Sequence, residues 1–188
     1  ISQGRTIELP GKLVSLWHKA HDLAFEGMPE RDGSAVRICQ FKVDDAINWA
    51  ANLPSKEGGI IWCYHKELAQ WLMEVGLAAG LPMLNCPAGE NDAIRDPKNS
   101  NKILVASVMA HGEGKNLQHH QNQYVLQWPR SARVSQQMLG RCHGTGQLAD
   151  ELIVSRCDTL PFDVLNFAAC LNDAVYQQQT TGVRQKMV

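Results

Sequence analysis

The sequence has 188 residues, of which 44% are apolar, and this is enough for one hydrophobic core and short for two. With 18 basic and 19 acidic residues the formal net charge is -1, so the overall charge neither supports nor excludes a nucleic-acid partner. No apolar run is long enough to cross a membrane and no charged-then-apolar leader opens the chain, so we expect a soluble, cytoplasmic protein without a membrane partner.

The first part of the chain predicts a lead-in region followed by one globular unit. Apolar residues recur at helical spacing over 12–25, and we expect residues 1–35 to be a linker with this helix and residues 36–188 to be a single domain. A β-prone run is expected at 36–41 and a helix at 44–52. The chain begins without an initiator methionine, which is compatible with a fragment of a longer protein.

From residue 60 onward, strands and helices are expected to alternate. The apolar pattern predicts strands at 60–64, 82–86, 103–108, 124–128 and 151–157, and helices at 67–75, 131–139 and 162–179. The segment 87–100 is rich in Gly, Asn, Asp and Pro and is expected to be an exposed excursion, and Ser131 is the expected N-cap of its helix. This alternation predicts an α/β fold with an open, mostly parallel sheet and helices on both faces.

No metal site is expected. Zinc ligands normally come in close pairs from tight turns, and the sequence contains no Cys-x-x-Cys pair. We therefore interpret the cysteines as reduced, mostly buried residues. They are Cys39, Cys63, Cys86, Cys142, Cys157 and Cys170. The adjacent His119 and His120 are expected to point to opposite sides of a strand entrance, which argues against joint metal binding.

Ligands of open parallel sheets bind at the carboxyl ends of the strands, and three segments are expected there: the loops after 60–64 and after 103–108, and the segment 137–147. The second loop contains Gly114-Lys115 but has Met109 and Asn116 where a P-loop requires glycine and a hydroxyl residue, so it is no P-loop. Its glycine turn and lysine can still approach a phosphate, although a tight turn with a solvated lysine explains the same residues.

The third segment contains an arginine near the expected end of a helix, followed by a turn with two glycines. An arginine there can neutralise charge on a γ-phosphate that another domain contributes, whereas a surface ion pair is the alternative for Arg141 taken alone.

Together these segments resemble superfamily 2 helicases. The order Gly-Lys-Asn-Leu-Gln (114–118), strand, Trp-Pro (128–129), helix, then Gln-x-x-Gly-Arg-x-His-x-x-Gly-Gln (137–147) is similar to motifs V and VI of that superfamily. The similarity is strongest to the Swi/Snf-like branch found in phage and plasmid replication genes. The run 60–68 is similar to motif IV, and the resemblance covers roughly 57–154.

The resemblance implies the second, C-terminal RecA-like domain of a helicase or translocase. Gln137 and Arg141 would then reach the phosphates of an ATP with Mg2+ that an N-terminal RecA-like domain binds, with Arg141 as an arginine finger. The other residues implied at the ATP site are Gly112, Gly114, Lys115, Asn116 and Gly140. Because the chain has neither a Walker A loop nor an acidic box for magnesium, we expect it not to hydrolyse ATP alone.

The resemblance also implies a nucleic-acid partner, DNA or RNA, held through its phosphate backbone. Such contacts tolerate sequence changes and weaken with salt. The expected contacts are His65, Lys66, Lys115, Gln118 and His119.

One position departs from the family pattern, because Gly144 replaces the second arginine of motif VI. Two functions therefore stay open: a motor lobe in which Arg141 suffices, or a catalytically degenerate module that binds DNA or a replication protein. An unrelated α/β nucleotide-binding enzyme that carries these motifs by chance is a third reading. The motor-lobe interpretation requires that folding bring the turn at Gly112 and the Arg141 guanidinium to a common rim.

Overall fold

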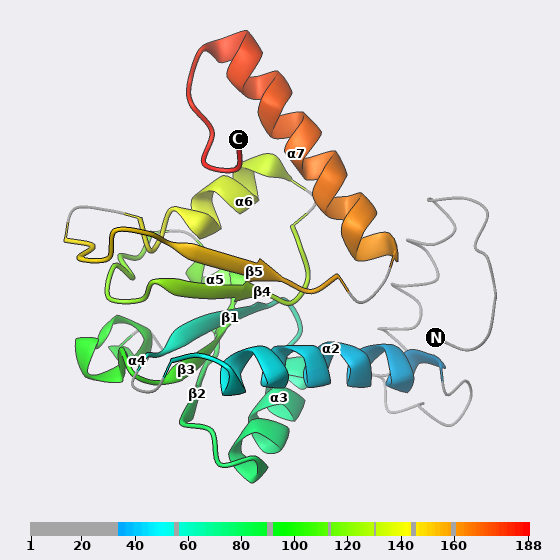
Figure 1. Cartoon of the computed structure of the whole chain (residues 1–188), viewed down its shortest axis with the longest axis vertical. Helices are drawn as coiled ribbons and strands as arrows, with labels where there is room; N and C mark the ends of the chain where they lie inside the picture. Colours follow the sequence, from blue (N-terminus) through cyan, green and yellow to red (C-terminus); the bar gives the residue numbers. More distant parts are fainter. Residues whose placement is uncertain are drawn as a thin grey trace.

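The computed structural model describes residues 34–54, 57–89, 92–112, 114–129, 131–143, 146–158 and 161–188. In these residues five strands form one sheet in the order β2-β3-β1-β4-β5, and every neighbouring pair is parallel (Figure 1). The strands are β1 (Gly59–Cys63), β2 (Met83–Cys86), β3 (Ile103–Ser107), β4 (Asn122–Val125) and β5 (Ile153–Arg156). The predicted α/β fold with an open parallel sheet is confirmed.

Helices cover both faces of this sheet. One face carries α2 (Ser34–Ala51) and α3 (Lys66–Ala78), which pack on the core cluster that contains Ile61 and Val105. The opposite cluster contains Ile60 and Leu104, and its helical residues come from four further helices. These are α4 (Asp92–Arg95), α5 (Val108–His111), α6 (Ala132–Leu139) and α7 (Pro161–Thr181), and a 3-10 turn, Pro97–Asn99, follows α4.

The central strands read as continuous apolar runs because both of their faces are covered. All five residues of β1 are buried, as expected for a strand in the middle of a parallel sheet. The Trp62 indole donates a buried hydrogen bond of 2.9 Å to the Gln123 amide oxygen of β4. The cysteines whose side chains are described are buried, as predicted, and they are Cys63, Cys86, Cys142, Cys157 and Cys170.

Several predicted elements need correction. The β-prone run at 36–41 is part of α2, whose helical spacing continues through the buried Val43, Ala46 and Ala50. The segment 87–100 is not simply exposed, because it contains α4 and the 3-10 turn and buries Ile94 completely. The predicted helix at 12–25 lies outside the described residues.

The strand predicted at 124–128 begins two residues earlier, at Asn122. Its first two side chains are polar but buried, and the Asn122 amide donates to the Glu57 carboxylate at 3.0 Å and to the Gly58 carbonyl at 3.3 Å. A buried strand that begins with polar residues does not show an apolar pattern in the sequence.

A buried ion pair joins helix α2 to helix α7. Lys42 of α2 donates from Nζ to the Asp163 carboxylate at 2.7 Å and to the Leu126 carbonyl at 3.0 Å. The exposed fractions of the two charged side chains are 0% and 3%. The pair therefore fixes the first turn of α7 against α2 beside the carboxyl end of β4.

The C-terminal segment after α7 folds back onto α6 (Figure 1). The Lys186 backbone N–H donates to the Gln136 side chain at 2.6 Å, and Met187 packs against the core cluster beside Cys170. This segment therefore covers the outer side of α6. None of the described helices is long and apolar enough to cross a membrane.

Candidate functional site

The structure separates the three predicted ligand segments onto two edges of the sheet. The loop after β1 lies at the carboxyl edge, as expected. The segment 137–147 does not, because α6 follows β4 and runs back to the edge where the strands begin (Figure 1). Eight helical residues rise about 12 Å, which matches the height of a four-residue strand, so the end of α6 reaches the amino edge. The predicted carboxyl-edge position of 137–147 is therefore wrong.

The glycine loop after α5 nevertheless meets the end of α6. The Leu117 N–H donates to the Arg141 carbonyl at 2.8 Å, and the Arg141 guanidinium donates from Nη1 to the Lys115 carbonyl at 3.4 Å. A second guanidinium hydrogen bond, of 2.9 Å, runs from Nε to the Gln137 carbonyl one turn back in α6. Folding thus brings Arg141 together with the Lys115–Leu117 part of the glycine loop, while a common rim with Gly112 and what the two segments bind stay predictions.

The half-buried guanidinium of Arg141 is held by neutral carbonyl groups. Within the parts of the chain that the structure describes, the ion pairs are Lys42–Asp163, Lys66–Glu67 and Arg156–Asp158, and none includes Arg141. The alternative in which Arg141 serves a surface ion pair therefore has no support among these residues. Carbonyl partners orient the side chain without neutralising its charge.

Lys115 is directed into its own loop. Its side chain is 9% exposed, and Nζ donates to the Ala110 carbonyl at 3.3 Å and contacts Nδ1 of His111. Nε2 of the fully buried His111 faces the carbonyls of Cys86 and Pro87 at 2.9 and 3.0 Å, so Nε2 carries the proton and Nδ1 accepts from the lysine.

Burial is the main cause that lowers the pKa of both groups in this pair. For His111 the nearby Lys115 charge also lowers the pKa, and for Lys115 the nearby Arg95 charge does so. The neutral imidazole therefore ties the end of β2 to the glycine loop. Lys115 belongs to a rigid loop rather than being the solvated lysine of the alternative reading.

The glycines predicted at the site differ in backbone conformation and surroundings. Gly114 has a φ of 70°, in the left-handed region that favours glycine, and a Cβ there would meet no atom within 4 Å. At Gly140, which follows α6, a Cβ would lie 2.6 Å from the Lys186 amine, the movable end of a long side chain, and 3.0 Å from the Gln136 carbonyl. Gly112 ends α5, and the exposed Asn116 next to Lys115 donates to the Gln118 side chain at 2.6 Å.

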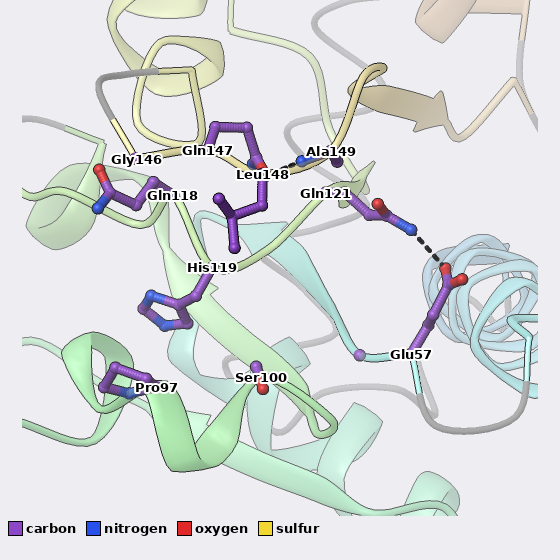
Figure 2. A pocket seen from close by; sticks show the side chains of 11 residues that line it. Glu57, Pro97, Ser100, Gln118, His119, Gln121, Gly146, Gln147, Leu148 and Ala149 are labelled. Atoms are coloured by element: carbon purple, nitrogen blue, oxygen red, sulfur yellow. Dashed lines mark hydrogen bonds between the residues drawn. The ribbon is translucent and has the colours of Figure 1, made fainter.

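A pocket opens at the amino edge of the sheet beside these two segments (Figure 2). Its volume is about 530 Å³. The lining residues are Glu57, Gly58, Pro97, Ser100, Gln118, His119, Gln121, Gly146, Gln147, Leu148 and Ala149. Gln147 holds its rim, because Nε2 donates to the carbonyls of His120 and Cys142 at 3.1 Å and the side-chain oxygen accepts from the Ala149 N–H at 2.9 Å.

His119, which lines this pocket, and the adjacent His120 have their ring centroids 4.4 Å apart. The expectation that the two side chains point to opposite sides is therefore wrong. The residues 118 and 119 form a turn before β4, where side chains do not alternate as they do in a strand. In the described residues no group of three or more His, Cys, Asp and Glu side chains could hold a metal.

His120 is buried in its neutral form. It is 1% exposed, neither ring nitrogen has a hydrogen-bond partner among the residues that the structure describes, and burial lowers its pKa to about 3. Because the unfolded histidine takes up a proton near pH 6.5 and the folded one does not, the stabilisation is complete above that pH and is lost as the pH falls towards 3.

We expect the His120→Phe variant to resist acid better than the native chain. Removing this titration lowers the slope of the free energy of unfolding against pH by about 1.4 kcal/mol per pH unit between pH 6 and 4. Urea unfolding at several pH values measures the slope, and His143→Phe, at an exposed histidine, is the matched control. Parallel pH profiles for the native chain and His120→Phe would contradict the burial argument.

The predicted nucleic-acid residues lie on both edges. His65 and Lys66 follow β1 at the carboxyl edge, where Lys66 is 81% exposed and its amine lies 3.8 Å from the Glu67 carboxylate. Gln118 and His119 line the pocket at the amino edge. A single nucleic-acid strand that contacted all four residues would have to run from the carboxyl edge of the sheet to its amino edge.

Comparisons with known proteins support the fold. No protein-family model matches the chain, and no curated protein matches it in sequence. A solved structure, the crystal structure of the C-terminal part of the Fun30 ATPase domain, is similar with a TM-score of 0.52 and 18% sequence identity. The match covers 61% of this chain and 40% of that one, so this chain spans well under two thirds of the neighbour. At this identity the likeness shows the fold, which this chain shares with a part of an ATPase domain.

Proposed function

We propose that this chain is the second motor lobe of a nucleic-acid-dependent ATPase of superfamily 2. The observation that carries the proposal is the direct contact between the glycine loop and the end of α6, where Arg141 binds the Lys115 carbonyl. These two segments are the ones that resemble motifs V and VI. The proposal includes membership of the Swi/Snf-like branch and a single domain over residues 36–188.

In this proposal Arg141 acts on the γ-phosphate of an ATP that the first lobe binds with Mg2+. Its guanidinium is oriented by carbonyl groups at 2.9 and 3.4 Å and keeps its positive charge available. Charge accumulates on the phosphate oxygens during transfer, and a fixed cation there stabilises the transition state. Gln137 precedes Arg141 by one helical turn and belongs to the same contact.

Nucleic acid would be held through its phosphates. The exposed Lys66 at the carboxyl edge fits this role best, because its amine has only a long contact with Glu67 among the ion pairs of the described residues. Lys115 would have to leave His111 before it could contact a phosphate. We therefore assign His65 and Lys66 to the track, and Lys115 to the support of the loop.

The test compares the 188-residue chain with the full natural polypeptide in which it occurs. We expect DNA-stimulated ATP hydrolysis from the polypeptide that contains both lobes, no hydrolysis from the chain alone, and salt-sensitive binding of single-stranded DNA by both. Hydrolysis by the chain alone, or a full polypeptide without a nucleotide-binding first lobe, would overturn the motor-lobe proposal.

The second candidate function is a degenerate RecA-like module that binds DNA or a replication protein. Gly144 in place of an arginine favours it. This candidate predicts DNA binding by the full polypeptide with no ATP hydrolysis in the presence or absence of DNA. The same pair of measurements therefore separates the two functions.

A further inference from the structure

The resemblance to helicases assigns no function to the pocket at the amino edge (Figure 2). The side chains that line it indicate which kind of ligand it can bind. It is formed by segments that come just before β1, β3, β4 and β5, and by the turn at Gln118 and His119. A volume of about 530 Å³ lies within the range of pockets that hold small organic ligands.

The lining is polar but carries almost no charge. Among the lining residues that the structure describes there is no lysine or arginine, and Glu57 is the one charged side chain. Burial lowers the pKa of His119, so its imidazole is neutral at pH 7. A phosphate would meet the Glu57 carboxylate, and the described lining residues supply no cation to compensate that charge. These residues therefore favour an uncharged ligand group that forms hydrogen bonds.

The upper and lower walls fit a flat ring. In Figure 2 the Leu148 side chain extends towards His119, whose imidazole lies above Pro97. Leu148 is 95% exposed, although leucine is usually buried. An aromatic heterocycle between these side chains would cover the leucine and stack on the imidazole.

The far wall fits sugar hydroxyl groups. The Glu57 carboxylate is fixed because Oε2 accepts from the Gln121 amide at 2.7 Å and from the Asn122 amide at 3.0 Å. Ser100 lines the same part of the pocket, because its carbonyl accepts from the N–H of Gly58, next to Glu57, at 3.1 Å. A fixed carboxylate is a common acceptor for the ribose hydroxyls of nucleotides.

We propose that this pocket binds the nucleoside part, base and ribose, of a nucleotide whose phosphates point towards Arg141. The pocket lies next to Arg141 along the chain fold. Leu117 precedes the lining residue Gln118, and its backbone N–H donates to the Arg141 carbonyl at 2.8 Å. The direction of the phosphates rests on the proposed function, whereas the nucleoside pocket rests on the lining alone.

The test measures binding of adenosine, ADP and pyrophosphate to the isolated chain by titration calorimetry, with the NMR signals of the His119 ring as a local probe. We expect adenosine to shift these signals, and we expect Glu57→Gln and Leu148→Ala each to weaken adenosine and ADP binding about tenfold, or roughly 1.4 kcal/mol. Pyrophosphate binding should not change. The matched controls, Glu74→Gln and Leu77→Ala, alter exposed side chains of α3 and should have no effect.

The outcomes separate this proposal from the motor-lobe proposal. If adenosine at millimolar concentration does not shift the His119 signals, or if the pocket variants bind it as the native chain does, the nucleoside pocket is wrong, whatever the full polypeptide hydrolyses. If an oligothymidylate displaces adenosine and ADP does not, the pocket holds a base of a nucleic-acid strand, and the proposal is again overturned. If adenosine binds as expected and the full polypeptide lacks DNA-stimulated hydrolysis, the pocket stands without the motor.

Discussion

Replacing Arg141 with alanine is expected to lower the DNA-stimulated kcat of the two-lobed polypeptide by about 1,000- to 100,000-fold, the effect of an arginine finger in related NTPases. The reason is that its cation is used when charge develops on the transferred phosphate, so the transition state loses more than the bound ATP. The measurement is steady-state ATP hydrolysis at saturating DNA. KM for ATP should change far less than kcat.

The structure supplies a control on the same helix. Arg133 in α6 is also an arginine but is exposed, and Arg133→Ala should leave kcat unchanged. Loss of Arg141 also removes two hydrogen bonds to carbonyls, so the unfolding midpoint of each variant is measured beside its kcat. An Arg141→Ala enzyme that folds normally and keeps its kcat would refute the assignment.

Gly144→Arg gives a complementary comparison because it introduces the arginine that the family pattern contains. If the native lobe is weakened at this position, the variant should raise kcat in the native background. It should fail to raise it in the Arg141→Ala background, because the two arginines would act on the same phosphate. An unchanged kcat would mean that Arg141 suffices.

The sequence predicted the fold where burial on both faces makes a strand entirely apolar. β1 and β3 are such strands, and the helices α3, α6 and α7 carry enough apolar spacing to be found. β4 was located two residues late because Asn122 and Gln123 are buried polar residues whose partners, Glu57 and Trp62, are far away in the sequence. Tertiary hydrogen bonds of this kind leave no local pattern.

The contact between the glycine loop and the end of α6 agrees with the prediction, but the edge of the sheet at which it lies does not. Motif order placed the glycine loop beside Arg141, but the general rule for parallel sheets put both at the carboxyl edge. That rule describes the loop that directly follows a strand, whereas Arg141 comes one short helix later and so lies at the other edge. The pocket was missed because Glu57, Ser100 and Leu148 lie in separate connections and none forms a motif with its neighbours.

The second large effect is expected at the buried ion pair between α2 and α7. Lys42→Met should lower the free energy of unfolding by about 3 to 5 kcal/mol, because the Asp163 carboxylate stays buried without the ammonium that neutralises it. The Leu126 carbonyl also loses the donor that lies 3.0 Å away. Urea denaturation at neutral pH, followed by circular dichroism, measures the change.

The double variant Lys42→Met/Asp163→Leu distinguishes a lost charge pair from lost packing. Replacing both charges with apolar side chains removes the desolvation penalty, so the double variant should be more stable than Lys42→Met by a few kcal/mol. The exposed pair Lys66–Glu67 is the matched control, because ion pairs in water contribute about 0 to 1 kcal/mol, and Lys66→Met should change stability little. If Lys42→Met and Lys66→Met proved equally stable, this charge pair would not hold α7. Its docking would then depend on other contacts, such as the Asn166 amide that donates to the Trp128 carbonyl at 2.7 Å and the apolar contacts around Cys170.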